Sequence, residues 1–394
     1  MDSPPLRAHW SLDPEVTFLN HGSFGACPTR VLEEQSRLRA RLEANPVRFL
    51  HRELPALAEA ARATLGDFVD ANPDDLAFLN NATTGVNTVL RSLRFAPGDE
   101  LLTTDHEYNA SRNALDFVAQ QWGVKVVVAR IPWPTPSAQS VVDAVLAQVT
   151  PNTRLLLIDH VTSQTALVMP LASIVRHLRN RGVETLVDGA HAPGQVPVSL
   201  RELGVAYYAG NCHKWLCAPK GAAFLYVRRD LQAGIRPLVI SHGYNSRRED
   251  LSRFRLDFDW TGTDDPTAVL CIPSALQTVG GLVPGGWPEV MARNHALAVS
   301  ARTLLHQKLG GAPRCPENLM GAMATVALPP GFPTEPSALG LDPLHGRLMD
   351  EHQIEVQITP WPRAPQRHVR ISAQLYNTHA EYQRLAEALV ALLR

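Results

Sequence analysis

The sequence lacks the features that would place it among secreted or membrane proteins. It has only 5 cysteines among 394 residues, odd in number and scattered, which does not fit the disulfide framework of a small secreted domain. The chain begins without a basic stretch followed by an apolar core, and no apolar run reaches the length of a membrane span. We therefore expect a cytoplasmic protein whose cysteines are small core residues.

Excess charge of one sign and the common nucleotide and metal motifs are also missing. The 37 basic and 38 acidic side chains leave a net charge of -1, which provides no general attraction to nucleic acid or to an acidic membrane. No GxxxxGK(S/T) loop, GxGxxG turn or HExxH pair occurs. We therefore expect no metal site and no nucleic-acid or membrane partner.

The sequence does contain an alternating pattern of strands and helices. Between residues 75 and 227, short β-rich runs alternate with helical patterns, which predicts a mostly parallel sheet covered by helices on both faces. The expected strands are 75–80, 100–105, 124–131, 154–160, 183–188, 206–210 and 222–227. The expected helices of this region are 86–93, 111–122, 141–149 and 171–181.

After residue 266 the pattern becomes that of a smaller α+β domain. Helical segments at 268–278 and 290–309 precede strands near 324–328, 355–359 and 369–373, and an amphipathic helix is expected at 380–393. A chain of 394 residues exceeds what one hydrophobic core usually supports. We expect an N-terminal arm at 1–20 that packs with the small domain, a large domain at 21–266 and a small C-terminal domain at 267–394.

Two residues at predicted strand ends indicate chemistry with pyridoxal phosphate (PLP). Lys214 lies between hydrophobic residues, where burial would lower the pKa of its amine and make it a nucleophile toward an aldehyde. Asp188 ends an apolar strand, where α/β proteins bind ligands, and could hold the ring-nitrogen proton that makes PLP an electron sink. A snorkelling surface lysine and a helix N-cap are the plainer alternatives.

Further segments could supply the other groups that PLP and an amino acid require. Thr83 and Thr84 lie at a helix start, where backbone N–H groups and hydroxyls could hold a phosphate. Tyr108 could stack on a conjugated ring, and His191 could reach the ring hydroxyl. Arg370 could capture an α-carboxylate in a bidentate manner. A threonine cap, a core tyrosine and a surface ion pair explain the same residues without a ligand.

Taken together, the chain resembles class V aminotransferase-fold proteins, which are fold-type-I PLP-dependent enzymes, and within them the isopenicillin-N-epimerase-like branch. The resemblance spans nearly the whole chain. Its most specific segments are residues 18–25, 43–49 and 80–85. The resemblance implies catalytic roles for Lys214 as the imine lysine, Asp188 at the ring nitrogen and Tyr108 stacking on the ring. The other residues that it implies are His191, Ala82, Thr83, Thr84, Asn211, His213 and Thr263 for the cofactor, and Arg370, Asn20 and His21 for the substrate.

The same resemblance implies a homodimer with shared active sites. The Thr-Gly-Thr element at 261–263 matches one that reaches the phosphate of the neighbouring subunit. The desulfurase branch of the family needs a nucleophilic cysteine shortly before the arginine strand, but none lies between Glu317 and Arg370, and Cys315 comes too early. Desulfuration by such a cysteine is therefore disfavoured.

The reaction that we expect is racemisation or epimerisation at the α-carbon of an amino acid or amino-acid derivative. The freed amine of Lys214 would remove the Cα proton, and a second acid on the opposite face, a tyrosine or a bound water, would return one. The alternatives are C–S cleavage of cysteine or a cysteine sulfoxide, transamination, and an idle PLP-binding scaffold. Arg247, Arg248 and Arg253 are candidates for a second carboxylate of the substrate, although a solvated surface is the plainer interpretation.

Overall fold

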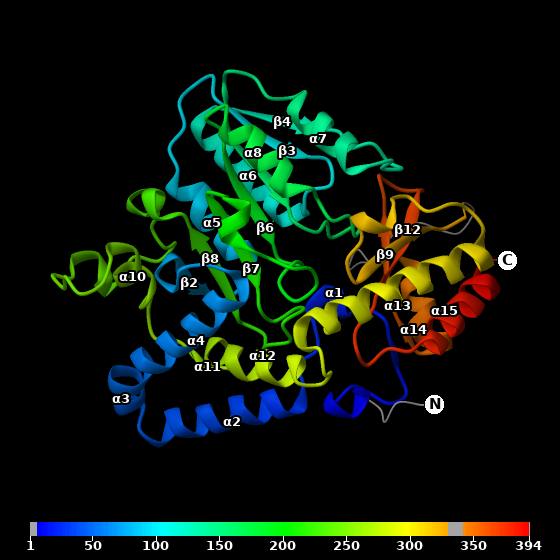
Figure 1. The fold of residues 1–394 in the computed structure, drawn as a ribbon, viewed down its shortest axis with the longest axis horizontal. Coiled ribbons are helices and arrows are strands. Elements are labelled where there is room, and N and C mark those ends of the chain that lie inside the picture. The colour runs from blue at the N-terminus through cyan, green and yellow to red at the C-terminus, as the bar shows by residue number, and fades with distance from the viewer. Residues whose placement is uncertain (1–5, 330–341, 394) are drawn as a thin grey trace.

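The computed structural model describes residues 6–329 and 342–393 and has two lobes built around separate sheets (Figure 1). The larger lobe holds a seven-stranded sheet in the order β2-β8-β7-β6-β5-β3-β4. Its strands are β2 (Leu76–Leu79), β3 (Glu100–Thr104), β4 (Lys125–Ala129), β5 (Thr153–Asp159), β6 (Glu184–Gly189), β7 (Tyr207–Asn211) and β8 (Ala223–Val227). The neighbours from β7 to β4 are parallel, whereas β8 runs antiparallel to β7 and β2. The predicted mostly parallel sheet is confirmed.

Helices cover both faces of this sheet because successive residues of each buried strand point to opposite sides. Leu156 and Ile158 of β5 belong to a hydrophobic core shared with α2, α4, α7, α8 and α12. Leu155 and Leu157 belong to a second core, shared with α5, α6 and α10. These helices are α2 (Thr29–Ala44), α4 (Leu54–Val69), α5 (Ala82–Ser92), α6 (Asn109–Trp122), α7 (Ala138–Leu146), α8 (Leu171–Arg179), α10 (Arg253–Phe258) and α12 (Ile272–Gly280).

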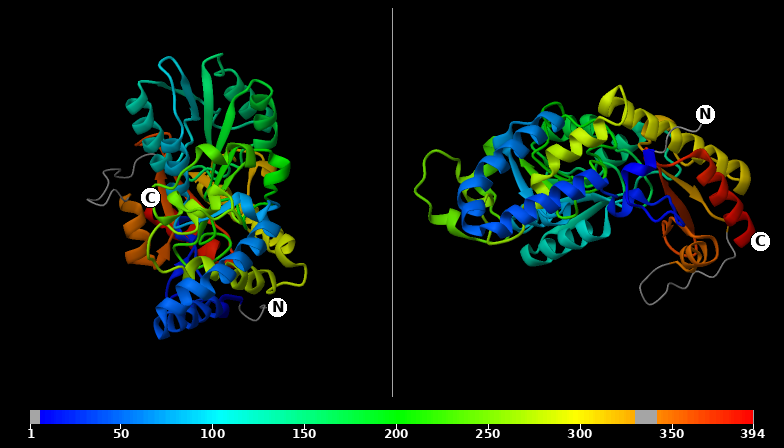
Figure 2. Two further views of the ribbon diagram at one scale, coloured as in Figure 1. Left: turned by 90° about the vertical axis from the view of Figure 1, so that its left-hand side faces the viewer. Right: turned by 90° about the horizontal axis from the view of Figure 1, so that it is seen from below.

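The smaller lobe is an α+β unit. Strands β9 (Met323–Ala327), β11 (Gln357–Pro360) and β12 (Arg367–Ser372) form an antiparallel sheet in the order β11-β12-β9. Helices α13 (Gly286–Leu309), α14 (Pro343–His352) and α15 (His379–Leu392) accompany it. The described part of the predicted arm joins this lobe, because β1 (Thr17–Phe18) pairs in parallel with β10 (Ile354–Glu355). Both termini lie on the side of the small lobe (Figure 2).

The two faces of the small sheet differ in chemistry. Val369 and Ile371 of β12 are fully buried in the core of the small lobe. The alternate residues His368 and Arg370 lie on the opposite face, and their neighbour on β9, Thr325, donates a hydrogen bond to the carbonyl of Thr165 in the large lobe at 3.1 Å. The polar face of β12 is therefore turned toward the large lobe.

The structure divides two elements that the sequence predicts as continuous. The helix expected at 268–278 consists of α11 (Thr267–Leu270) and α12, since Pro273 has no backbone N–H and its ring would clash with the preceding turn of an unbroken helix. The strand expected at 355–359 is divided between β10 and β11. Helices α11 and α12 pack against α2 and α4, and we propose that the large lobe extends past residue 266. The other predicted domain boundaries stay predictions.

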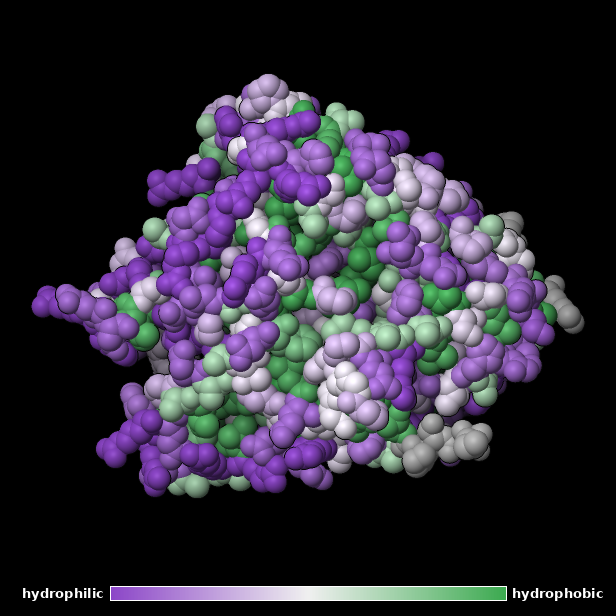
Figure 3. Space-filling model, viewed as in Figure 1, coloured by the Kyte–Doolittle hydropathy of each residue, from purple (hydrophilic) through white to green (hydrophobic). Residues whose placement is uncertain are grey.

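The surface in Figure 3 is mostly hydrophilic, with hydrophobic residues gathered between the lobes and over α2 and α4 at the lower left. The remaining α-helices of the described ranges are short: α1 (His21–Phe24), α3 (Pro46–Arg48) and α9 (Leu200–Leu203). Within the described ranges, none of the helices has the length and apolar character needed to cross a membrane.

Gly25 provides a test of the packing around the loop that carries Lys214. It ends α1 with a φ of 71°, and a Cβ there would lie 2.8 Å from Cα of Lys214. Gly182 has the same φ but open space around it. We expect Gly182→Ala to lower the free energy of unfolding by about 1–2 kcal/mol, the cost of left-handed backbone. Gly25→Ala should cost about 1–3 kcal/mol more, because its ψ of 160° is adopted almost only by glycine and because overpacking is added.

Urea denaturation of both variants measures this difference. Both glycines have a φ of 71°, so Gly182→Ala serves as the control for a positive φ without a contact with Lys214. Equal losses of stability in the two variants would contradict the close packing of Gly25 against the Lys214 loop.

Candidate active site

The carboxyl ends of three neighbouring strands bring the central residues together. Asp159 ends β5 and Asp188 lies near the end of β6, and the two are register partners in the parallel ladder. Lys214 follows β7, the next strand of the sheet. Open α/β sheets bind ligands at this edge, and the structure places both predicted central residues there.

Lys214 is partly buried, and its amine has defined neighbours. Nζ of Lys214 lies 3.0 Å from Nε2 of His191. Burial, and secondly the positive charge of Arg370, lower the pKa of Lys214 from 10.5 to about 8, although the carboxylates of Asp188 and Asp159 oppose this. A substantial fraction of the amine is therefore neutral and nucleophilic near pH 8.

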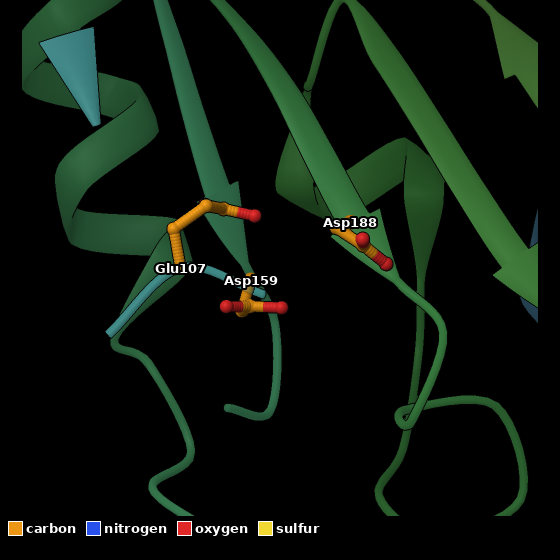
Figure 4. Close-up of side chains that lie close together, drawn as sticks. All are labelled: Glu107, Asp159 and Asp188. Carbon is orange, nitrogen blue, oxygen red and sulfur yellow. The ribbon is translucent and has the colours of Figure 1, made fainter. Parts of the chain in front are cut away.

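Three buried carboxyl groups form an acidic cluster beside this amine. Oxygen atoms of Glu107, Asp159 and Asp188 all lie within 4.8 Å of one another (Figure 4). Burial is the main cause that raises the pKa of each group, and mutual repulsion adds to it for Glu107 and Asp159. The spacing alone does not assign a metal ion, and the expected lack of a metal site stays a prediction.

The hydrogen bonds of the acidic cluster favour ionisation of Asp188. Ser111 donates its hydroxyl proton to Oδ2 of Asp188 at 2.6 Å, and the backbone N–H of Ala190 donates to Oδ1 at 3.0 Å. Asp159 accepts one N–H, from Tyr108, at 3.1 Å. Glu107 accepts only the hydroxyl of Thr103, at 3.3 Å, and its other oxygen has no partner among the described residues. Donors to a carboxylate stabilise its charged form, so the negative charge concentrates on Asp188.

The sequence predicts no role for Ser111, Glu107 or Asp159. Asp159 had a usable signal, because it ends an apolar strand in the same way as Asp188 does. Ser111 and Glu107 lie close to Tyr108 in the sequence, but no local pattern shows that the start of α6 approaches β6.

At the start of α5, the structure distinguishes between the predicted phosphate ligands. The N–H of Ala82 donates to Oδ1 of Asn211 at 2.8 Å, and the N–H of Thr84 donates to Oδ1 of Asn81 at the same distance. Among the described residues, the N–H of Thr83 has no such acceptor. We therefore infer that Thr83 provides the open donor at this helix N-terminus, while Ala82 and Thr84 are occupied by capping bonds.

His213 and Tyr108 follow the carboxyl ends of the parallel strands β7 and β3, and neither is fully buried. Nδ1 of His213 donates to the carbonyl of Ala222 at 3.0 Å, which leaves Nε2 available. Tyr108 precedes the first residue of α6, and its side chain is 40% exposed although its backbone is fixed by Asp159. Thr263 is exposed on the loop after α10. The predicted roles of these residues stay predictions.

Arg370 is buried without a carboxylate partner in the described part of the chain. It donates to the carbonyl of Ser163 at 2.6 Å and to the hydroxyl of Ser23 at 2.8 Å. Its Nε has no partner, and burial lowers the pKa of the guanidinium to about 10. Buried cations are normally paired, so this site favours a ligand carboxylate.

Asn20 and His21, the two other predicted substrate residues, form hydrogen bonds with groups of the protein itself. Asn20 lies 3.3 Å from Nη2 of Arg370 through Oδ1 and donates to Glu355 at 3.0 Å. Nε2 of His21 donates to the carbonyl of Lys214 at 3.1 Å, while its Nδ1 accepts from the hydroxyl of Tyr376 at 2.9 Å. His21 is fully buried, so we infer that it positions the Lys214 loop instead of contacting the substrate.

The residues present fit PLP. Burial, then the charge of Lys214, hold the pKa of His191 well below its usual range, so its imidazole is neutral. With Nε2 facing Lys214, Nδ1 of His191 is buried and unpartnered among the described residues, which suits an oxygen of the cofactor. The acidic cluster suits a protonated ring nitrogen, because a buried negative charge needs a cation. Of these groups, the sequence predicted His191 and Asp188 for PLP.

The five cysteines are enclosed to different degrees, and Sγ of Cys217 lies 3.7 Å from Nε2 of His21. Cys27, Cys212, Cys217 and Cys271 are buried, and Cys315 is partly buried. Burial raises the pKa of all five thiols, which opposes formation of the reactive thiolate.

Comparison with known proteins gives full-length matches. The sequence model of the family described as "Aminotransferase class-V" matches residues 19–260. The chain is 40% identical to "Isopenicillin N epimerase" of Amycolatopsis lactamdurans, over 98% of this chain and 97% of that protein. It is 34% identical to the protein of the same name from Streptomyces clavuligerus, over 99% of this chain and 98% of that protein. It is 31% identical to "Probable L-cysteine desulfhydrase, chloroplastic" of Arabidopsis thaliana, over 97% of this chain and 84% of that protein.

Solved structures share the fold. A mutant of C-DES with glycine covalently linked to its PLP cofactor has a TM-score of 0.81 at 22% identity, over 98% of this chain and 100% of that one. The cysteine desulfurase CsdA from Escherichia coli has a TM-score of 0.78 at 22% identity, over 98% of both chains. These similarities confirm the predicted fold class.

The lowered pKa of Lys214 predicts the pH dependence of its reactivity. In protein freed of cofactor, labelling of Lys214 with acetic anhydride should rise with pH through a midpoint near 8, because only the neutral amine reacts. Mass spectrometry of the Lys214 peptide, with exposed Lys308 as the internal reference, measures this profile. A midpoint near 10.5 would show that the amine is not desolvated.

Proposed function

This chain belongs to the aminotransferase class-V family of PLP-dependent enzymes, and from that premise we propose that it racemises or epimerises an amino acid or amino-acid derivative at the α-carbon. The observation that carries the proposal is the amine of Lys214, which lies beside His191 and the acidic cluster with a pKa lowered to about 8. The identity of 40% to an isopenicillin N epimerase supports this reaction over others of the family.

Each part of the cofactor has a proposed partner. Nζ of Lys214 would bond the aldehyde carbon of PLP, Asp188 would hold the ring-nitrogen proton, and His191 would contact the ring hydroxyl. Tyr108 would cover one face of the ring. Thr83, Asn211 and His213 would surround the phosphate. When bound, PLP withdraws electrons from the α-carbon of an attached amino acid.

Lys214 is the residue that would move the proton. A lysine whose pKa is about 8 can take a proton from carbon as the neutral amine near neutral pH, and a second acid on the opposite face would return one to give inversion. The neighbouring imidazole of His191 is neutral, so it does not oppose that protonation by charge. Asp188 meanwhile stays anionic because Ser111 and Ala190 donate to it.

Arg370 would bind the α-carboxylate of the substrate. Its guanidinium is already oriented by Ser163 and Ser23, so little side-chain entropy remains to be lost on binding. Anchoring the carboxylate fixes the position of the α-carbon between the lobes, within the reach that proton transfer to a side chain requires.

C–S cleavage is the second candidate function. It is favoured by the identity of 31% to a probable L-cysteine desulfhydrase of Arabidopsis thaliana. Both reactions need the same proton removal by Lys214, and they differ in whether the α-carbon regains a proton or a β-sulfur group departs.

We also propose a cytoplasmic homodimer with shared active sites and a small amino-acid substrate. The apolar side chains of Val239, Ile240 and Tyr244 are 57%, 54% and 63% exposed, which fits a surface covered by a second copy. Leu238 and Val239 line a cleft of about 740 Å³ together with Thr261 and Gly262, the start of the Thr-Gly-Thr element. This element would reach the phosphate bound by the second copy.

Reaction in deuterated water distinguishes the candidate functions. We expect the holoenzyme to place solvent deuterium at the α-carbon and to give product of inverted configuration, because Lys214 removes the α-proton and a second acid that has exchanged with solvent delivers deuterium to the opposite face. NMR and chiral chromatography measure the two effects across a panel of amino acids. Pyruvate with a released thiol would instead identify the lyase, and a keto acid would identify the aminotransferase.

Two lysine variants control this experiment. Lys214→Ala should lower the exchange rate by at least about 100-fold and remove the visible absorption of covalently held PLP. Lys220→Ala removes another lysine of the same loop, which donates to the carbonyl of Gly25, and should keep both signals. If Lys214→Ala retained the absorption and the exchange, another residue would have to hold the cofactor.

Mixing of two inactive variants tests the shared active site. Lys214→Ala lacks the amine, and Thr263→Glu places a negative charge where the second copy's phosphate would lie. A mixed dimer has one intact and one doubly altered site, so random mixing should restore about a quarter of the activity of the unaltered protein. Analytical ultracentrifugation confirms the mixing. Lack of recovery in proven mixed dimers would contradict sharing.

A further inference from the structure

Buried nitrogen atoms without hydrogen-bond partners gather between the two lobes. Nε2 of His106, Nε1 of Trp133, Nε1 of Trp361 and both ring nitrogens of His368 are enclosed and unpartnered among the described residues. His106, Trp361 and His368 are 0%, 8% and 4% exposed. We call these four residues the junction cluster. Buried polar atoms normally have partners, so their concentration here indicates a missing one.

The four rings are in contact with one another. The ring of His106 lies 4.6 Å from that of Trp361 and 5.5 Å from that of Trp133, centre to centre. The ring of Trp133 lies 5.9 Å from that of His368. His106 and Trp133 come from the large lobe, whereas Trp361 and His368 come from the small lobe. The junction cluster therefore spans the boundary between the lobes.

The junction cluster lies next to the groups proposed to bind the amino acid. His368 precedes Arg370 by two residues on the same face of β12, a separation of roughly 7 Å along the strand. Nδ1 of His106 lies 2.7 Å from the hydroxyl of Thr165, two residues beyond the Ser163 carbonyl that accepts from Arg370. A substrate anchored on Arg370 can thus extend its side chain toward His368.

The chemistry of the junction cluster favours a hydrogen-bond acceptor. Indole N–H groups only donate, and Trp133 and Trp361 contribute one each. Burial lowers the pKa of His106 to about 3 and that of His368 to about 4, so each neutral ring carries one N–H and one acceptor nitrogen. The N–H of His106 lies on the unpartnered Nε2 when the hydroxyl of Thr165 donates to its Nδ1. Arg314 adds positive charge, since it is near enough to His368 to contribute to the lowered pKa, and its own Nε is unpartnered. Carboxylate oxygens accept such bonds most strongly.

We propose that the junction cluster binds the end of the substrate side chain and that this end is an oxygen acceptor, with a carboxylate preferred. This inference rests on the proposed function and names its class of substrate. The exposed residues 362–366 must shift to admit the side chain, because the nitrogen atoms are enclosed. The aromatic rings then pack against its methylene groups.

The arginines that the sequence suggested for a second carboxylate are less suited to this role. Arg248 is exposed and pairs with Asp250 at 2.5 Å. Arg253 donates to the carbonyls of Tyr244 and Ser246, at 3.2 and 2.9 Å. Both arginines bind groups of the loop in which they lie, whereas the indole N–H groups of the junction cluster and both ring nitrogens of His368 have no partner in the described ranges.

A matched series of substrates tests the proposal. α-Amino acids with one to four side-chain methylene groups, ending either in a carboxylate or in a methyl group, are compared at equal length with the holoenzyme. We expect the carboxylate series to exchange its α-proton at least about tenfold faster at the best length, because a charged acceptor replaces several unsatisfied donors. Calorimetric Kd values for the same series give this ratio without turnover.

Variants that remove a single N–H locate the effect. Trp361→Phe keeps an aromatic ring and should reduce the preference for the carboxylate by about tenfold, with little change for the methyl series. Trp122→Phe makes the same change at the last residue of α6, roughly 20 Å from its start, and should leave the preference unchanged.

The outcomes separate this proposal from the proposed function. No preference for a carboxylate, or equal preferences in the two tryptophan variants, would overturn the junction cluster as a substrate site even if α-proton exchange is fast. Absence of exchange with every amino acid would instead contradict the proposed function, and the Kd ratio would still decide whether the junction cluster binds an acceptor.

Discussion

The burial of a lysine amine beside ionisable carboxyl groups is the constraint on which this site depends. Water would screen Lys214 and Asp188 from each other, but at the carboxyl edge of the sheet they are desolvated, and their pKa values shift in opposite directions. Such a site is stable only if the protein supplies hydrogen bonds in place of water. Ser111, the N–H of Ala190 and the ring of His191 supply them, so the fold must hold α6, β6 and β7 in a fixed relation.

In the small lobe, the buried charge of Arg370 also needs hydrogen bonds in place of water. Arg370 is oriented by neutral oxygens, the carbonyl of Ser163 and the hydroxyl of Ser23, and not by a carboxylate. A carboxylate partner would stabilise the free protein but would have to be displaced by an anionic substrate, which weakens binding. The two-faced sheet makes this arrangement possible, because Val369 and Ile371 secure β12 in the lobe core while the alternate residues face the site.

The sequence predicts those parts of the molecule that have a local signal. Short β-rich runs that alternate with helical patterns predict the central sheet. Asp188 is recognisable because it ends an apolar run, and Lys214 because it lies between hydrophobic residues. Helices α2, α4 and α14 were not predicted, and the positions of Ser111, Glu107 and Asp159 depend on long-range contacts that no short segment encodes. The capping bonds of Ala82 and Thr84 also needed the structure, because Asn211 reaches Ala82 from 129 residues away.

In the acidic cluster, two neighbouring carboxyl groups determine the charge state of Asp188. Three adjacent buried carboxyl groups cannot all ionise, and the number of donors decides which does: two for Asp188, one N–H for Asp159 and one long hydroxyl contact for Glu107. Protons retained on Glu107 and Asp159 remove repulsion from Asp188. Two cations can then pair with the negative charge of Asp188: the ammonium of Lys214 and a protonated ring nitrogen. Since the amine pairs more weakly as its pKa falls, lowering the pKa of Lys214 also leaves Asp188 free to hold the heterocycle.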